Sequence, residues 1–399
     1  MKQIINHFTD NDLYTFSCQY YIMQQYPRAE VAYTFIDRNN TVYPEGFSDL
    51  LQEQVNYMEN VIITDEEIDF MATRCVWLPL WYFTFLRGYR FNPNEVHISQ
   101  DVEGHLEITI RGKWFSTIMW EMPLLSCISE IMHILNGDRE RYDMEAERQK
   151  VVEKSKRIFS SGLVFGDMGT RRRFSFDHQK MVLETMKNVY NSQSWPGVFT
   201  GSSNVWLAMK LNLIPLGTLS HQIISFEEIV SGVFECNYMV MKKFSDVYDG
   251  NNGIYLYDCF GDKLFFNNLS KRMAMMYCGL RVDSGNEEEQ IEKIIEKYKQ
   301  LGINPSTKQV VFSNALDVDR CIEIHNYCAG RVQDSYGVGT SLMCDVNGVK
   351  PANIVIKLTK GRITELREWH DCVKLSCDKG KTLGNPRKCD YILGLIENG

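Results

Sequence analysis

The sequence contains no C-x-x-C motif, although 12 of its 399 residues are cysteines. The closest pair is Cys372 and Cys377, so both zinc-site spacing and the disulfide frame of a short secreted domain are missing. We therefore expect free thiols in a reducing compartment. The N-terminal segment M-K-Q-I-I-N-H-F-T-D also lacks the apolar core of a signal peptide, which predicts a cytoplasmic protein.

Long apolar runs and net positive charge are scarce as well. The most apolar run, residues 75–86, contains Pro79, is bounded by Arg74 and Arg87, and is too short to span a bilayer. The formal net charge is −8, so the diffuse positive field that attracts nucleic acids or membrane surfaces is missing. We expect neither a nucleic-acid nor a membrane partner, while a small local basic site stays compatible with this charge.

Two common glycine-rich motifs for nucleotides are absent. The segment K-G-K-T at 379–382 ends like a Walker A loop, but Leu375 occupies the position of the first glycine. No G-x-G-x-x-G segment occurs either. Any phosphate-binding loop must therefore be of another kind.

The composition is that of an ordinary globular protein, with 44% apolar, 24% charged and 12% aromatic residues. Its length allows two domains. Residues 1–137 mix element types in an α+β pattern, and Thr64 with Glu67 forms a capping box that opens a helix. The other elements predicted in the α+β parts are a helix at 13–26 and strands at 31–36, 95–98, 106–110, 353–358, 364–367 and 373–375.

From about residue 161, apolar strands alternate with helices at intervals of roughly 20–40 residues, which is typical of βα units. Seven or eight such parallel strands close most economically into a barrel, and a doubly wound open sheet is the alternative. We predict an α/β protein with a barrel domain, 138–345, and a discontinuous α+β domain, 1–137 with 346–399. The predicted barrel strands are 163–165, 198–199, 213–216, 254–257, 280–282, 310–312 and 332–336.

Polar side chains follow these strands, where a barrel carries its catalytic loops. This mixture of cations and carboxylates suits an anionic, phosphorylated, sugar-like substrate, because arginines neutralise a diphosphate leaving group. Asp283 could hold ribose hydroxyls or a metal-bound water. For the arginine run the alternative is a solvated basic turn, and for the histidine it is a loop or core position. The collected residues are Arg171, Arg172, Arg173, His221, Asp258, Arg281, Asp283, Ser313 and Thr340.

Two loops near the end of the barrel segment have the composition of phosphate sites. They are S-N-A-L-D at 313–317 and G-V-G-T at 337–340. Hydroxyl groups and exposed backbone N–H groups at a helix start favour phosphate, although ordinary tight turns have the same composition. Tyr14 near the N-terminus is equally compatible with a core or interface position.

At these residues the chain resembles the nicotinate phosphoribosyltransferase family. The resemblance covers nearly the whole chain, and its segments keep the family's order. The segments are T-D-N-D-L-Y (9–14), M-G-T-R-R-R-F-S (168–175), G-S-S-N-V-W-L-A-M-K (201–210), L-G-T-L-S-H (216–221), L-R-V-D-S-G (280–285), V-F-S-N-A-L-D (311–317), G-V-G-T (337–340), N-I-V-I-K-L (353–358) and V-K-L-S-C-D-K-G-K-T (373–382).

The resemblance implies both a fold and a reaction. The fold is an irregular (β/α) barrel of the type II phosphoribosyltransferase kind with a second domain, usually as a homodimer with sites at the subunit interface. The reaction transfers phosphoribosyl from 5-phosphoribosyl 1-diphosphate to nicotinate, giving nicotinate mononucleotide and diphosphate for NAD salvage. It is coupled to ATP hydrolysis, and Mg²⁺ is carried on the diphosphate, so no metal site made of protein residues is expected.

The resemblance also implies roles for individual residues. His221 would be the histidine that ATP phosphorylates, and phosphohistidine would bring negative charge into an arginine-lined site. Three further groups follow by motif: Tyr14, Thr218 and Arg281 at nicotinate; Asp258 and Asp283 at the base or ribose; and Arg171, Ser313, Gly339 and Thr340 at phosphates.

Four positions depart from the family pattern. Gln222, Asn286 and Asn314 replace acidic residues, and Cys259 replaces a threonine. The lost negative charge would weaken Mg²⁺ handling or ATP coupling. Two alternatives therefore stand beside an active enzyme: a nicotinamide-preferring phosphoribosyltransferase and a catalytically silent ligand-binding relative. Nicotinamide enzymes tend to be longer than this chain.

Overall fold

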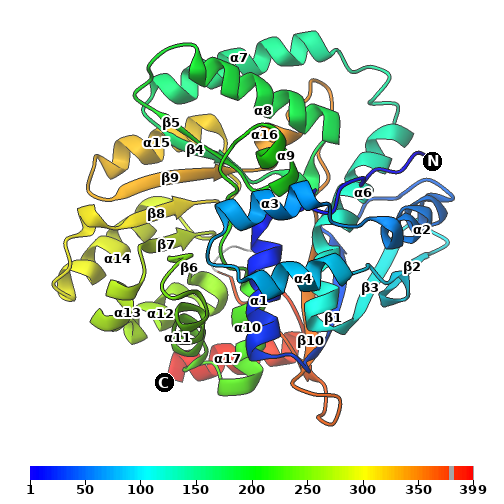
Figure 1. Cartoon of the computed structure of the whole chain (residues 1–399). Helices are drawn as coiled ribbons and strands as arrows, with labels where there is room; N and C mark the ends of the chain where they lie inside the picture. The colour runs from blue at the N-terminus through cyan, green and yellow to red at the C-terminus, as the bar shows by residue number, and fades with distance from the viewer. Residues whose placement is uncertain (377–381, 399) are drawn as a thin grey trace.

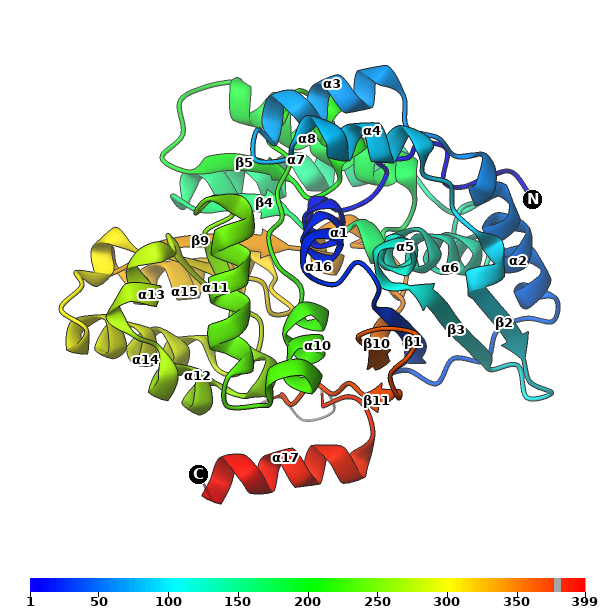
Figure 2. The same cartoon turned by 60° about the horizontal axis from the view of Figure 1, so that its bottom comes forward.

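The computed structural model describes residues 1–376 and 382–398. Its strands form two sheets, one of five antiparallel strands and one of six parallel strands. Figures 1 and 2 show the parallel sheet and its helices on one side of the molecule and the antiparallel sheet on the other, with helix α1 between them. The K-G-K-T segment that we rejected as a Walker A loop lies almost wholly outside the described residues.

The antiparallel sheet has the strand order β11-β10-β1-β3-β2 and combines both ends of the chain. The 3-10 turns η1 (Met58–Asn60), η2 (Pro93–Glu95) and η3 (Ile118–Trp120) lie in its N-terminal part. The other elements are α1 (Leu13–Gln25), β1 (Glu30–Asp37), α2 (Phe47–Tyr57), α3 (Asp65–Arg74), α4 (Leu80–Gly88), β2 (Val96–Gln100), β3 (Leu106–Lys113), α5 (Trp114–Thr117), α6 (Glu121–Leu135), β10 (Ile354–Arg362), β11 (His370–Asp371) and α17 (Pro386–Asn398).

Strand β1 is the centre of this sheet because it alternates buried and partly exposed residues and pairs on both sides. Val31, Tyr33 and Phe35 point into the core. Strand β10 from the C-terminal tail pairs with β1 along its whole length. The proposed boundaries of the two domains stay a prediction.

The capping box at the start of α3 is confirmed: the Thr64 side chain accepts from the Glu67 backbone, and the Glu67 carboxylate accepts from the Thr64 backbone. Our predictions of two strands in the C-terminal tail are wrong. Residues 364–367 form a turn, and in 373–375 only Lys374 makes an isolated bridge, to Leu383. The reason is that Leu375 donates its backbone N–H to Cys259 O, so this segment crosses to the barrel.

The parallel sheet has the order β5-β4-β9-β8-β7-β6. Within it the 3-10 turns are η4 (Thr170–Arg172), η5 (Asp258–Phe260) and η6 (Pro305–Thr307). Its other elements are α7 (Met144–Ser160), β4 (Val164–Asp167), α8 (Phe176–Asn191), β5 (Val198–Ser202), α9 (Val205–Lys210), α10 (His221–Ser231), α11 (Cys236–Tyr248), β6 (Ile254–Leu256), α12 (Asp262–Asn268), α13 (Lys271–Met276), β7 (Gly279–Val282), α14 (Glu287–Gln300), β8 (Gln309–Phe312), α15 (Val318–Cys328), β9 (Gln333–Val338) and α16 (Thr340–Met343).

This strand order is that of a barrel opened between β5 and β6, because all other sequential strands are neighbours and β9 returns to β4. A doubly wound sheet would instead reverse direction from its middle. The strand predicted at 213–216 is reduced to one parallel bridge between Pro215 and Ser202. Proline has no N–H to extend such a ladder, which accounts for the irregular closure here.

The stretch Trp114–Leu135, which comprises α5, η3 and α6, is long and apolar enough to cross a membrane. It exceeds the run at 75–86 that the sequence analysis singled out. However, 89% of its most apolar window is buried inside the protein. It is therefore a core helix. The described cysteines form no disulfide, in agreement with the expected free thiols.

Candidate active site

A cavity of about 1230 Å³ lies at the carboxyl ends of the barrel strands and reaches the antiparallel sheet. The antiparallel sheet contributes Arg38, which follows β1, and Lys357 of β10. The structure thus brings together residues that are far apart in the sequence. The residues predicted for the site that line this cavity are Tyr14, Arg171, Arg172, Thr218, His221, Arg281, Asp283, Ser313, Gly339 and Thr340.

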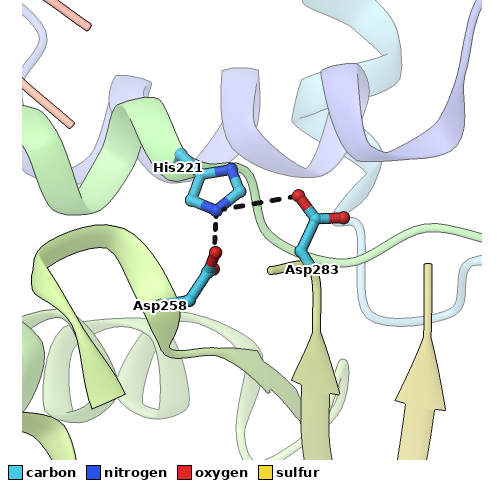
Figure 3. A group of neighbouring side chains, drawn as sticks. All are labelled: His221, Asp258 and Asp283. Atoms are coloured by element: carbon cyan, nitrogen blue, oxygen red, sulfur yellow. Dashed lines mark hydrogen bonds and ion pairs between the residues drawn. The ribbon is translucent and has the colours of Figure 1, made fainter. Parts of the chain in front are cut away.

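His221 begins helix α10 and faces two carboxylates (Figure 3). Its Nε2 lies 2.7 Å from Oδ1 of Asp258, in η5 after β6, and 3.9 Å from Oδ2 of Asp283, after β7. Burial, aided by Lys374, lowers the pKa of His221 to about 4, so the imidazole is neutral near pH 7. Since an ionised Asp258 can only accept, Nε2 carries the proton and Nδ1 the lone pair.

Asp258 lies behind His221 instead of in the cavity wall. Its Oδ2 accepts from the Ser284 hydroxyl at 2.6 Å and lies 3.4 Å from Nζ of Lys374. Burial disfavours its charge, but His221 and Lys374 hold its pKa well below the usual range. Asp258 is therefore a buried anion, and its hydrogen bond fixes the orientation and the tautomer of the His221 imidazole.

His221, Asp258 and Asp283 also form a group whose possible ligand atoms lie within 4.8 Å of one another, the spacing of a cation site. The ammonium of Lys374 already provides a positive charge at Asp258, which disfavours a second cation there. This geometry is compatible with our expectation that Mg²⁺ comes with the substrate.

The guanidinium of Arg281 is poorly satisfied by the protein. Nη1 donates to Leu219 O at 3.4 Å, Nη2 is 3.7 Å from Oδ1 of Asp283, and Nε has no hydrogen-bond partner among the described residues. The same oxygen of Asp283 accepts from the Ser313 hydroxyl at 2.6 Å. A half-buried, under-satisfied guanidinium is suited to a planar anion such as a carboxylate.

Four cations form another part of the wall: Arg38, Arg171, Arg172 and Lys357. Burial, reinforced by neighbouring arginines, lowers the pKa of Arg172 to about 9. Its Nε donates to Ile354 O at 3.0 Å, which directs it toward β10. These cations and the G-V-G-T loop make one cationic region that is suited to phosphate groups.

The prediction that Arg173 lies at the barrel mouth is wrong. Its side chain is fully buried and binds Asp10 through Nη1 at 2.6 Å and Nη2 at 2.8 Å. Its Nε donates to Glu130 at 2.8 Å. After η4 the backbone turns inward, and these two carboxylates neutralise the charge. Arg173 is thus part of the structural core.

Comparison with known proteins identifies a family to which this chain belongs. The profile of the nicotinate phosphoribosyltransferase family matches residues 163–382, and that of its N-terminal domain matches residues 9–129. The chain belongs to the nicotinate phosphoribosyltransferase family. A nicotinate phosphoribosyltransferase of Desulforapulum autotrophicum is 37% identical over 99% of this chain and 100% of its own length.

Solved structures of this family have the same fold. The enzyme from Porphyromonas gingivalis superposes with a TM-score of 0.94 at 36% identity, over 99% of this chain and 100% of that one. A putative nicotinate phosphoribosyltransferase from Saccharomyces cerevisiae gives a TM-score of 0.93 at 25% identity, over 100% of both chains. The predicted fold class, an irregular (β/α) barrel of the type II phosphoribosyltransferase kind with an α+β part, is confirmed.

The departures from the family pattern differ in their surroundings. Asn286 lies outside the cavity wall and caps α14 by accepting from the Glu289 backbone, a role that aspartate and asparagine share. Gln222 lines the cavity, and its Oε1 accepts from the Tyr33 hydroxyl at 2.5 Å and the Trp114 indole at 3.1 Å. Gln222 keeps an acceptor where the family has a carboxylate.

The remaining two departures lie close to the site. Asn314 is part of the cavity wall. Cys259 is buried, with its Sγ 3.7 Å from His221 O. Lys357 and Lys374 have no predicted role, although both stand in segments that resemble the family. Glu121 also lines the cavity, and no pattern in the sequence indicates it.

Gly217 allows the L-G-T segment to pack directly on the start of α1. Its φ is +151°, and a Cβ there would lie 2.6 Å from the backbone N of Tyr14. We expect Gly217→Ala to lower kcat/KM for nicotinate by roughly tenfold or more, because a misplacement of about 1 Å is costly in a preorganised site. Steady-state kinetics will check this.

Gly232→Ala is the matched control. Its φ is +81°, and nothing lies within 4 Å of an added Cβ. It shares the backbone strain of the Gly217 variant without the close approach to Tyr14. Equal losses in both variants would show that strain alone, and not the contact with α1, is responsible.

Proposed function

We propose that this chain transfers phosphoribosyl from 5-phosphoribosyl 1-diphosphate to nicotinate, giving nicotinate mononucleotide and diphosphate, and couples this transfer to ATP hydrolysis. The observation that carries the proposal is that one cavity is lined by both the under-satisfied guanidinium of Arg281 and His221, which Asp258 supports from behind. The guanidinium of Arg281 is suited to binding a pyridine carboxylate, and the hydrogen bond from His221 to Asp258 activates the imidazole as a nucleophile. The product would be used for NAD salvage.

The cavity offers a separate region for each part of the substrates. Arg281 faces the carboxylate of nicotinate, with Thr218 and the Tyr14 ring beside the pyridine. Asp283 holds ribose hydroxyls or a water on Mg²⁺ that is carried by the diphosphate. A carboxamide would bring no negative charge to Arg281, whose only ion pair among the described residues is the 3.7 Å contact with Asp283, and this favours nicotinate over nicotinamide. The phosphate groups are held by Arg171, Ser313, Gly339 and Thr340.

His221 acts as the phosphoacceptor in this proposal. The lone pair of Nδ1 attacks the terminal phosphorus of ATP, the bond to the bridging oxygen breaks, and ADP leaves. Asp258 stabilises the positive charge that develops on the ring. The phosphohistidine then adds negative charge beside Arg281 and Lys374 and reorganises their contacts.

The transfer itself passes through an oxocarbenium-like ribosyl centre. Such a centre needs positioning and charge neutralisation more than a protein nucleophile. We further propose a cytoplasmic homodimer, as is usual in the family, with ATP and Mg²⁺ as its required co-reactants.

The test is nicotinate mononucleotide formation by the purified protein with and without ATP, beside His221→Ala. We expect ATP to accelerate turnover by roughly 5- to 150-fold, the range of a typical coupling free energy. His221→Ala should lose this acceleration and keep the basal rate. His97→Ala, which changes an exposed histidine of β2, is the matched control.

Three outcomes would count against parts of the proposal. No product under any condition would favour the silent ligand-binding relative. A preference for nicotinamide in direct competition would favour the second alternative. An ATP effect that survives in His221→Ala would exclude His221 as the phosphoacceptor.

A further inference from the structure

Glu121 connects three distant parts of the chain at the cavity. It is the first residue of α6 and is 5% exposed. Its Oε2 accepts from the Tyr14 hydroxyl of α1 at 2.9 Å, and its Oε1 lies 3.9 Å from Nζ of Lys357 on β10. All three residues line the cavity. The carboxylate of Glu121 therefore lies within reach of a cation in the part of the wall that gathers Arg38, Arg171, Arg172 and Lys357.

The hydroxyl of Tyr14 is committed to Glu121. Burial, and then the charge of Glu121, raises the pKa of Tyr14 well above its usual value, so this hydroxyl stays protonated and keeps donating. A substrate in the cavity therefore meets the aromatic ring of Tyr14 and not a free hydroxyl. The packing of Gly217 against the backbone of Tyr14 fixes the other end of this residue.

Lys357 is surrounded by both carboxylates and cations, which act on its pKa in opposite directions. Burial lowers the pKa of Lys357 to about 8. Glu121 from α6 and Asp283 after β7 favour its protonated form, whereas Arg171 from η4 and Lys374 from the tail oppose it. Of these two carboxylates Glu121 lies nearer, with its Oε1 3.9 Å from Nζ, so loss of its charge would lower the pKa of Lys357 further.

We propose that Glu121 is a positioning residue that holds the Tyr14 ring and the Lys357 ammonium against the cavity, where Lys357 binds a phosphate group of 5-phosphoribosyl 1-diphosphate. The inference rests on the proposed function for the identity of this donor. Glu121 acts through its two neighbours and does not contact the reacting atoms.

The test is the pH dependence of 5-phosphoribosyl 1-diphosphate binding, measured by titration calorimetry, together with the pH profile of kcat/KM. Glu121→Gln keeps the size and the acceptor for Tyr14 but removes the charge. Because an opposite charge within about 4–6 Å shifts a pKa by one to three units, we expect the alkaline limb to move lower by about one unit or more. Ionisation of the donor's own phosphates is common to both proteins and cancels in the comparison.

Two further variants separate the parts of this inference. Lys357→Arg should keep binding and remove the alkaline limb near pH 8, since a guanidinium stays charged there. It provides a test even if Glu121→Gln does not fold. Tyr14→Phe keeps the ring and should leave the limb where it is in the wild type. A merely structural role of Glu121 would lower stability without moving any limb.

The outcomes distinguish this inference from the proposed function. Wild-type protein that binds the donor without turnover would refute the proposed activity, while the calorimetric comparison would still decide the role of Glu121. An unchanged alkaline limb in both Glu121→Gln and Lys357→Arg would overturn the role of Glu121. No binding by the wild type at any pH would overturn both.

Discussion

Asp258→Asn should remove most of the ATP acceleration of nicotinate mononucleotide formation, a loss of up to roughly 5- to 150-fold, because Asp258 acts through His221. Asp258 accepts from Nε2 of His221 at 2.7 Å and from the Ser284 hydroxyl at 2.6 Å. Asparagine can present its amide group to His221, which favours the tautomer with the proton on Nδ1 and removes the lone pair that attacks ATP. The variant also leaves the Lys374 ammonium buried without its nearest anion.

Single-turnover assays with labelled ATP would follow the phosphorylated protein directly, and thermal unfolding would report any loss of structure. Asp262→Asn is the matched control, because Asp262 pairs with Lys293 outside the cavity. Phosphorylation of Asp258→Asn at the wild-type rate would contradict the role assigned to Asp258, whatever the overall turnover.

The site could be predicted in outline because parallel strands converge. Asp283 and Ser313 follow neighbouring strands, so their positions in the sequence place them at one edge of the sheet, and the structure brings them within 2.6 Å. The same reasoning collected His221 and Asp258. Local spacing was sufficient here because each strand and the loop after it are contiguous.

The opposite wall of the cavity could not be predicted in this way. Glu121, Tyr14 and Lys357 meet only because α1 and α6 pack near a strand from the C-terminal tail. No spacing in the sequence records this packing, and the antiparallel sheet is closed by β1 and β10, which are far apart in the chain. Contacts of this kind depend on tertiary packing alone.

The arginine run shows a second limit. Arg171 and Arg172 line the cavity, whereas the adjacent Arg173 is buried in the core. Adjacent residues on a turn point in different directions, so a basic tripeptide does not reveal which of its members faces solvent. The carboxylates that neutralise Arg173 are Asp10 and Glu130, and nothing in the run itself indicates them.

The replacements of acidic residues also show that position in the sequence does not reveal whether a side chain lies at the site. In the sequence, Asn286 and Asn314 both count as lost charge near the site. The structure separates them, because Asn286 caps a helix and Asn314 lines the cavity. Only the charge lost at Asn314 and Gln222 bears on substrate handling. The positions of these replacements therefore favour an active enzyme over a catalytically silent relative.

Arg173→Met should lower the free energy of unfolding by about 3–5 kcal/mol, the cost of breaking a buried ion pair from one side. Asp10 also accepts from Nδ2 of Asn204 at 2.7 Å, so the arginine completes a network that connects the N-terminal segment with α6 and α9. Its loss leaves Asp10 without an ion-pair partner among the described residues, while Glu130 keeps Arg139 at 2.7 Å. Urea denaturation at neutral pH measures the change.

Arg157→Met is the appropriate comparison, since Arg157 pairs with Asp319 at the surface, where both side chains are more than half exposed. Such a pair contributes about 0–1 kcal/mol. Asp10→Asn in the Arg173→Met background should recover part of the loss, because it removes the carboxylate that the first substitution leaves buried without a cation. Equal effects of the Arg173 and Arg157 variants would mean that the buried network adds nothing beyond a surface pair. A large loss of unfolding free energy in Arg173→Met, partly recovered in the double variant, would establish that the buried ion pairs of Arg173 stabilise the packing of the N-terminal segment on the barrel.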